Sequence, residues 1–137
     1  MTQEDKQLLL KDLCMRLPYG VRVKFRNYVD ICTIKSIDIS NTDYYPITLN
    51  NSFEQGANID EVKPYLRPMS SMTEEEIKEF YKIENIIPKV GYICPSQDWH
   101  FTVKGLDWLN ANHFDYRGLI KKGLGIEVTE ENYPYKK

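Results

Sequence analysis

Apolar residues recur at helical spacing close to the N-terminus and predict a helix over residues 4–17. The apolar positions are Leu8, Leu9, Leu10, Leu13, Cys14 and Leu17. Thr2 is placed to cap this helix, with Asp5 three residues further on as its capping-box partner. Pro18 and Gly20 follow the last apolar position, and both residue types disrupt helices. The helix is therefore predicted to end just before them.

The pattern then changes from helical spacing to strict alternation over residues 21–26, which is typical of a strand. Apolar Val21, Val23 and Phe25 alternate with basic Arg22, Lys24 and Arg26. A tight connection is expected to lead into a second β-rich run at residues 29–39, and a third strand is predicted at residues 45–49. Residues 50–58 are polar and are predicted to form a mobile loop. Together these segments predict a small antiparallel sheet.

The best-defined helix start lies in the middle of the chain, at Thr73. The side chain of Thr73 can accept a hydrogen bond from a free backbone N–H, and Glu76 stands at the reciprocal position of a capping box. Met72 and Ile77 supply the flanking apolar pair that fixes how the chain enters the helix. These signals predict a helix over residues 74–83.

Proline residues separate this helix from the strands that precede it. Pro64 and Pro68 are expected to hold the preceding segment out of regular helix, with at most a short helical turn within residues 59–66. A short strand is predicted at residues 90–94. Apolar spacing disappears in residues 129–137, which are predicted to be a frayed tail.

Two helix starts follow one another near the C-terminus and predict a pair of short helices joined at residues 112–115. Thr102 and Asp115 are the predicted caps, because the side-chain oxygen of each can accept from free backbone N–H groups. The flanking apolar pairs are Phe101 with Leu106 and Phe114 with Leu119. The whole pattern predicts an α+β fold, in which an N-terminal helix, a small antiparallel sheet, a middle helix and a C-terminal helical pair pack on one sheet face.

The composition fits a single α+β domain over residues 1–128. The chain has 137 residues, of which 42% are hydrophobic and 28% charged, and is long enough to bury a core without disulfides or metals. Its net charge of -2 excludes a global basic field that would attract nucleic acid or an anionic membrane. There is no apolar leader and no apolar run near the ~20 residues of a membrane span, so we expect a cytoplasmic protein that does not contact membranes.

Several segments carry a resemblance to a known family. They are MTQEDKQLLLKDLC, LPYGV, KPYLRPMSSMTEEE and DWLNANHFDYRGLIKKGL. Together they resemble a family of small uncharacterised proteins found in gut anaerobic bacteria and often associated with prophages and mobile elements. The resemblance covers most of the chain and is least distinctive at residues 44–58. It implies a bacterial cytoplasmic origin and a role in a mobile element, and it carries over no catalytic, cofactor-binding or metal-binding residue.

Few residues suggest catalysis or metal binding. Cys94, Asp98 and His100 are of the types that bind metals or act as nucleophile and base, but the chain has no paired Cys or His motif. His113 lies at the junction of the two C-terminal helices and is expected to close a helix end. The three cysteines are too few and too widely spaced for a disulfide framework and are expected to be reduced. We therefore predict that the protein is not an enzyme and has no cofactor or metal site.

Two basic patches keep a nucleic-acid interpretation open. The first is on the predicted strand, where cations on one face would stand about 6.6 Å apart, close to the spacing of phosphates. The second is on the predicted helix over residues 116–122, whose short link to the preceding helix resembles a helix-turn-helix. The residues are Arg22, Lys24 and Arg26 in the first patch and Arg117, Lys121 and Lys122 in the second. Alternatively, such cations keep an exposed sheet face and its edge soluble.

Aromatic residues are abundant, with ten tyrosines and two tryptophans in the chain. Such side chains are enriched at protein interfaces, although they can equally cover a small core with their hydroxyls in water. The candidate interface residues are Trp99, Tyr116, Tyr44 and Tyr45. We therefore expect a non-catalytic accessory or interaction protein of a mobile element that acts through a protein partner. The alternative is a nucleic-acid-binding protein that uses strand 22–26 and helix 116–122.

Overall fold

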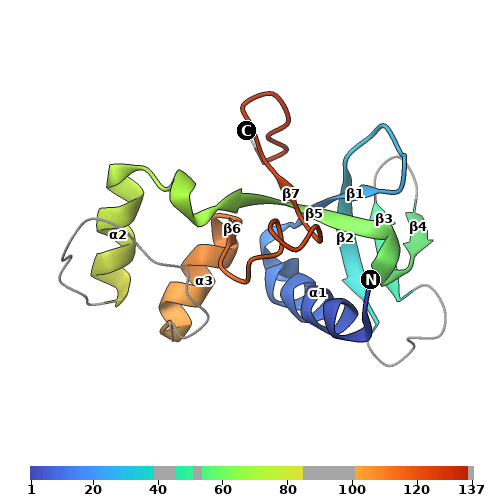
Figure 1. Cartoon of the computed structure of the whole chain (residues 1–137), viewed down its shortest axis with the longest axis horizontal. Helices are drawn as coiled ribbons and strands as arrows, with labels where there is room; N and C mark the ends of the chain where they lie inside the picture. The colour runs from blue at the N-terminus through green and yellow to red at the C-terminus, as the bar shows by residue number, and fades with distance from the viewer. Residues whose placement is uncertain (39–45, 51–53, 85–100, 136–137) are drawn as a thin grey trace.

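The computed structural model describes residues 1–38, 46–50, 54–84 and 101–135, and over these ranges the chain forms three α-helices and a seven-stranded sheet (Figure 1). The helices are α1 (Gln3–Arg16), α2 (Glu74–Glu84) and α3 (Val103–Ala111). The strands are β1 (Arg22–Phe25), β2 (Cys32–Ile37), β3 (Ile47–Asn50), β4 (Glu54–Ala57), β5 (Val62–Pro68), β6 (Phe114–Asp115) and β7 (Ile126–Glu127). The sheet order is β4-β3-β2-β1-β5-β6, with β7 also paired to β5. The predicted α+β class is confirmed.

Local capping chemistry sets the start of each helix. The hydroxyl of Thr2 accepts from the N–H of Asp5 and the carboxylate of Asp5 accepts from the N–H of Thr2, so the predicted box at α1 is confirmed. The same reciprocal pair joins Thr73 and Glu76 at α2. At α3, the Thr102 hydroxyl accepts from the N–H of Gly105. These three starts needed only residues close in sequence.

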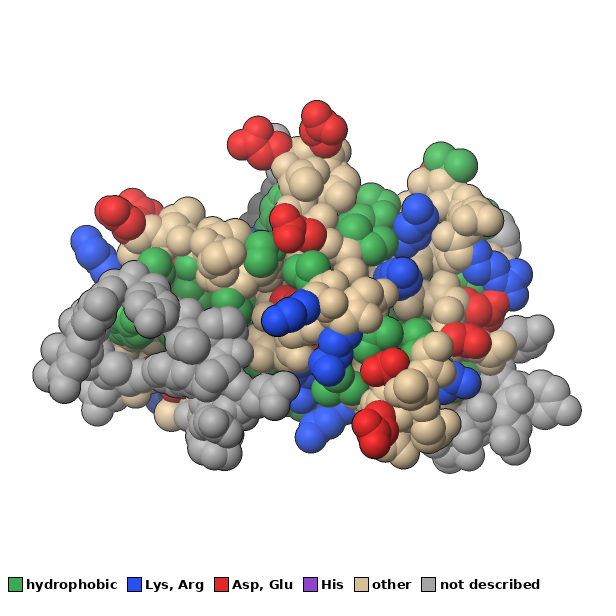
Figure 2. All heavy atoms as spheres, in the orientation of Figure 1, with side chains coloured by type: hydrophobic (Ala, Val, Ile, Leu, Met, Phe, Trp, Pro, Cys, Tyr) green, Lys and Arg blue, Asp and Glu red, His purple; other side chains and the backbone are tan. Residues whose placement is uncertain are grey.

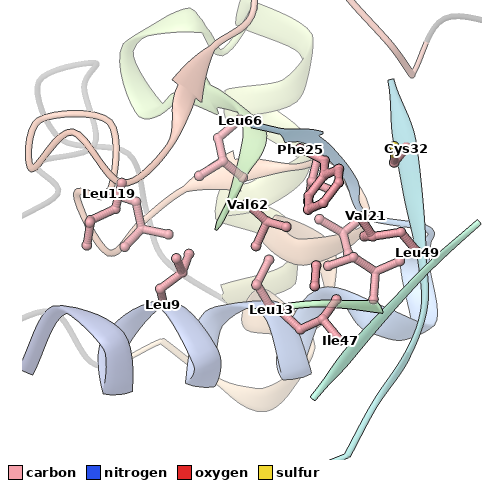
Figure 3. Packing of buried hydrophobic residues seen from close by; sticks show 14 residues of the cluster. Leu9, Leu13, Val21, Phe25, Cys32, Ile47, Leu49, Val62, Leu66 and Leu119 are labelled. Carbon is pink, nitrogen blue, oxygen red and sulfur yellow. The ribbon is translucent and has the colours of Figure 1, made fainter. Parts of the chain in front are cut away.

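The alternation in β1 places its apolar side chains on one face and its cations on the other, as predicted. Figure 3 shows how Leu9 and Leu13 of α1 pack against the buried residues of β1, β3 and β5. β1 pairs antiparallel with β2, and β2 pairs with β3. β2 begins only at Cys32. Val29 is therefore outside the strand and is almost fully exposed.

The predicted mobile loop at residues 50–58 is wrong for residues 54–57. These residues form β4, which pairs with β3 over four residue pairs from Ile47 with Ala57 to Asn50 with Glu54. β4 is an edge strand, and only Ala57 is buried, so its sequence lacks the apolar alternation that identified β1. Its position depends on hydrogen bonds to a neighbouring strand, which local polarity does not reveal.

Residues 59–68 contain no regular helix, as predicted: a short 3₁₀ turn at Ile59–Glu61 leads into β5, a strand in the middle of the sheet that the sequence did not reveal. The N–H of Arg26 donates to the C=O of Glu61, so alternate residues of β5 bond to β1. Val23 and Pro64 are partners in the intervening position, where antiparallel strands exchange no backbone hydrogen bonds. The missing N–H of Pro64 therefore does not interrupt the ladder, and Pro68 ends the strand.

The predicted second C-terminal helix is also wrong. Residues 116–125 form turns and bends, although Asp115 does cap this segment by accepting from the N–H groups of Leu119 and Ile120. Gly118 and Gly123 adopt φ of 75° and 76°, a left-handed conformation that ends a right-handed helix. The predicted helical pair is therefore one helix, α3, followed by a capped turn region.

Two hydrophobic clusters divide the interior. One lies between α1 and the sheet, and the other contains residues of α2, α3 and β6 (Figure 1). β5 extends from the first cluster toward the second, and Arg67 near its end pairs with Glu76 of α2 at 2.7 Å. Within the described ranges, no helix is long and apolar enough to cross a membrane.

Candidate binding face

The side of the sheet opposite α1 carries exposed cations. Val21, Val23 and Phe25 point toward α1, which leaves the charged side chains of β1 on the other side. We call this surface the open face and define it by Arg22 and Lys24 of β1, by Arg26 just after β1, and by Lys63 of β5. Figure 2 shows one view of the surface, with Lys and Arg side chains over the part where Figure 1 places β1. Arg22 and Lys24 thus share one surface, as the alternation predicted, whereas Arg26 has a positive φ of 50° and lies outside the strand.

Lys24 and Lys63 are directly opposite one another on β1 and β5. Side chains at such positions have Cβ atoms about 5 Å apart, and like charges there destabilise the sheet. Neither lysine forms a salt bridge with any residue in the described ranges. The sheet therefore keeps a repulsive pair at its surface that a neutral or acidic residue would remove.

A hollow of about 400 Å³ lies beside this pair. Its described lining residues are Lys24, Arg26, Lys63 and Ile126. Arg26 also forms a salt bridge with Glu61, so the two lysines carry the uncompensated positive charge. The hollow is open to solvent and has an apolar wall at Ile126, which suits an anionic group attached to a larger partner.

Tyr135, on the C-terminal segment, forms hydrogen bonds to both β1 and β5 at one end of the open face. The Tyr135 hydroxyl accepts from the N–H of Arg22 at 3.1 Å and donates to the C=O of Tyr65 at 2.8 Å. Extending the β1–β5 register by one step makes Arg22 and Tyr65 partners, so the hydroxyl bridges the two strands where their own pairing stops. These contacts do not fit the frayed tail that we predicted for residues 129–137. Burial raises the pKa of Tyr135 to about 12, so its hydroxyl stays neutral.

His113 packs on the other side of this tyrosine. The two rings are stacked, with centroids 3.4 Å apart and an interplanar angle of 10°. Burial, assisted by the charges of Arg16 and Arg67, lowers the pKa of His113 to about 4. His113 has a φ of 64°, and its N–H donates to the C=O of Asn110, so it closes the end of α3 as predicted. A neutral, buried imidazole in this position stabilises the C-terminal segment.

A group of charged side chains is buried between the two hydrophobic clusters. Arg16 of α1 donates to Asp12 at 2.7 Å and to the C=O of Phe114 at 2.6 Å. Arg117 Nε lies 3.2 Å from the other Asp12 oxygen but is not oriented to donate a hydrogen bond to it. Asp12 and Arg16 are fully buried, so solvent does not reach them. The arrangement suits a structural link between α1 and the C-terminal segment.

The structure separates the two predicted basic patches. Arg117 is held at Asp12 on α1, on the opposite side of the sheet from the open face. Lys122 lies near Asp5 of α1: the main cause of the lowered Asp5 pKa is its hydrogen bond from the Thr2 N–H, and Lys122 adds a smaller contribution. Lys121 is exposed. Arg117 and Lys122 therefore do not join the open-face cations.

Of the predicted interface aromatics, only Tyr116 is in the described ranges, and it is partly buried. Its hydroxyl donates to the side chain of Asn110 at 2.9 Å, and the guanidinium groups of Arg16 and Arg117 lie over its ring. Tyr116 therefore packs inside the molecule rather than at a free surface. Tyr44, Tyr45 and Trp99 lie outside the described residues.

The candidate metal or nucleophile residues Cys94, Asp98 and His100, and the predicted strand at residues 90–94, also lie outside the described residues. Where the chain is described, no group of three His, Cys, Asp or Glu side chains is close enough to hold a metal ion. Cys14 and Cys32 are thiols, and burial raises the pKa of Cys14.

Sequence reasoning missed Lys63 of the open face and two residues beside this face, Ile126 and Tyr135. Lys63 does alternate with buried Val62 and Pro64, but the prolines hid the strand. Ile126 and Tyr135 reach this surface only through contacts with β5 that are distant in sequence. Comparisons with models of protein families, with curated proteins and with solved structures found no match to this chain.

Proposed function

We propose that the protein is a non-catalytic interaction protein that binds a protein partner through its open face. The observation that carries the proposal is the Lys24–Lys63 pair beside an open hollow. A like-charged pair weakens the sheet, whereas an anionic group of a partner would bind between the two ammonium groups. The family resemblance adds a role in a bacterial mobile element to this proposal.

Acidic residues next to the open face favour a protein partner over nucleic acid. Glu130 and Glu131 are exposed on the C-terminal segment that follows Ile126 of the hollow. Figure 2 shows acidic side chains on this protruding segment, close to basic side chains of the sheet. Nucleic acid carries a negative charge at every phosphate and would meet these carboxylates, while a protein can place its acidic groups selectively.

Nucleic-acid binding remains the second candidate because Arg22 and Lys24 stand on one face of β1 at about the phosphate spacing. It predicts an affinity for duplex DNA that falls with salt at a log–log slope near -0.9 per phosphate neutralised. We expect no DNA or RNA binding above background at physiological salt, since Arg117 does not contribute to the same surface.

Affinity purification from the native host tests the proposal when it is done with matched variants. The test variant is Lys24→Glu with Lys63→Glu, and the control is Lys82→Glu with Lys104→Glu, which changes net charge equally at exposed sites of α2 and α3. We expect the wild type and the control to retain the same partner and the test variant to lose it. Equal recovery by all three proteins would refute the role of the open face.

A further inference from the structure

We infer that the open face recognises an extended acidic segment of the partner, with carboxylates at alternate positions and one of them between Lys24 and Lys63. This inference rests on the proposed function and names the chemistry of the partner. It follows from the geometry of β1 and β5, from the hollow, and from the exposed acidic residues of the C-terminal segment.

The spacing of the free cations on β1 sets the period of the segment. Arg22 and Lys24 are both exposed and two residues apart, which places them about 6.6 Å apart on the same side of the strand. Neither forms a salt bridge within the described part of the chain. An extended peptide has the same two-residue repeat, so carboxylates at alternate positions match both cations at once.

Lys63 makes the position at Lys24 a stronger binding site for a carboxylate than the position at Arg22. A carboxylate placed between Lys24 and Lys63 has two oxygens and can accept from both ammonium groups. The same carboxylate offsets the repulsion between the two ammonium groups. This repulsion is present in the free protein, so its relief adds to the free energy of binding. The adjacent hollow of about 400 Å³ has room for that side chain and part of its neighbour.

The C-terminal segment limits the length of the acidic motif. Ile126 forms the apolar wall of the hollow, and the carboxylates of Glu130 and Glu131 are exposed further along the same segment. A long acidic run would approach these groups and be repelled. A short motif with two or three alternating carboxylates avoids this repulsion and still reaches Arg22, Lys24 and Lys63.

Fluorescence anisotropy with two labelled peptides tests this inference. One peptide carries Glu at three alternate positions with Thr between them, and the other has the same composition with the three Glu adjacent. We expect the alternating peptide to bind at low salt at least about tenfold more tightly than the other, and to be released as salt screens the charges. A duplex DNA oligonucleotide serves as the polyanion for comparison.

Charge reversal at Lys63 provides a signature that a structural role would not give. Lys63→Glu should weaken the alternating peptide at least about tenfold and at the same time raise the melting temperature, because it replaces a like-charged pair with an attractive one. Lys63→Gln should weaken binding less and also leave the fold intact. Lys82→Glu on α2 is the control and should leave peptide affinity unchanged.

Three results would overturn the inference: equal affinity for both peptides, tighter binding of the DNA, or loss of binding only in variants that also unfold. Absence of binding by both peptides would overturn it as well. If partner capture still depends on Lys24 and Lys63 in that case, the proposed function stands and only the alternating acidic motif is refuted.

Discussion

At the scale of single residues, the hydroxyl of Tyr135 replaces a backbone hydrogen bond between β1 and β5. Its hydroxyl stands between Arg22 and Tyr65, where β1 and β5 would otherwise need to approach each other. An aromatic residue near the end of the chain thus completes a strand pairing that begins more than 100 residues earlier. This makes the C-terminal segment part of the sheet's stability.

We expect Tyr135→Phe to lower the free energy of unfolding by about 1–2 kcal/mol, because it leaves the C=O of Tyr65 and the N–H of Arg22 without this partner. Urea denaturation measures the change. Tyr133→Phe is the matched control, since no hydrogen bond of the Tyr133 hydroxyl to a described residue is seen, and its denaturation midpoint should stay near that of the wild type. Equal effects of the two changes would contradict the bridging role.

The depressed pKa of His113 predicts how stability depends on pH. The folded-state pKa is about 4 and the ordinary value is 6.5, so the unfolded chain binds a proton first as pH falls. The stability due to neutral His113 is present above pH 6.5 and is lost progressively toward pH 4. Between pH 7 and pH 5 we expect a loss of about 2 kcal/mol in the free energy of unfolding.

Urea denaturation across this pH range, with His113→Asn as control, isolates the contribution. Asn tolerates the positive φ of 64° at this position and does not titrate. The variant should therefore show a flatter profile between pH 7 and pH 5. The lowered pKa of Glu76, caused mainly by its hydrogen bond with Arg67, acts at lower pH, below the ordinary value of 4.5 for this carboxyl group. A profile as steep as that of the wild type would exclude His113 as the cause.

At the scale of elements, α2 and α3 are linked end to start by Glu84. The carboxylate of Glu84 accepts from the N–H of Thr102 at 3.0 Å and also from its hydroxyl. A Cβ on Gly105 would lie 2.6 Å from Glu84 Cδ. The glycine in α3 is thus required by the approach of a side chain from the neighbouring helix.

Gly105→Ala should therefore destabilise the protein by about 1 kcal/mol, although alanine normally stabilises a helix by about that amount relative to glycine. Thermal denaturation followed by circular dichroism measures the effect. In a Glu84→Ala background the obstacle is absent, and the same change should become stabilising. A higher melting temperature for Gly105→Ala alone would show that Glu84 moves aside without loss.

The elements that the sequence predicts well are those fixed by neighbours in the chain. The caps at Thr2, Thr73 and Thr102 depend on residues three positions away, and the alternation of β1 needs only its own four residues. Asp115 shows where local signals fail. Its carboxylate caps the following N–H groups as predicted, but two glycines at positive φ prevent the segment from continuing as a helix. Local signals thus predicted where an element starts more accurately than whether that element is a helix or a turn.

The elements that it misses depend on pairing with distant strands. β4 is polar because it lies at the edge, and β5 contains prolines whose missing N–H groups matter only once the register with β1 is known. The same reason limited the candidate site. The cations of β1 could be assigned to one face from alternation, whereas Lys63 joins them only through that register.

At the scale of the whole molecule, a buried ion pair connects two hydrophobic clusters. Arg16 links α1, which packs on the sheet, to the C=O of Phe114, which belongs to the cluster of α2 and α3. Among the described residues, Arg16 Nη1 and Asp12 Oδ1 have no hydrogen-bond partner although both side chains are fully buried. Such a contact contributes less to stability than apolar packing would, but it fixes how the two clusters are oriented.

We expect Arg16→Met to lower the free energy of unfolding by about 3–5 kcal/mol, because Asp12 then loses its closest counter-charge while still buried. Urea denaturation measures this loss. Replacing both partners, as Asp12→Leu with Arg16→Met, should recover part of the loss, since no unpaired carboxylate remains. A double variant less stable than Arg16→Met would show that Asp12 is stabilised mainly by Arg117, which lies 3.2 Å away.

The same variants test whether the ion pair makes the two clusters unfold together. In a Trp99→Phe background, Trp108 is the remaining tryptophan and reports on the cluster of α2 and α3, while far-ultraviolet circular dichroism reports on the whole fold. The two signals should change at the same urea concentration in the parent protein. In Arg16→Met the Trp108 signal should change first, because that cluster loses the connection of Phe114 to α1. Coincident transitions in Arg16→Met would mean that β5 alone couples the two clusters.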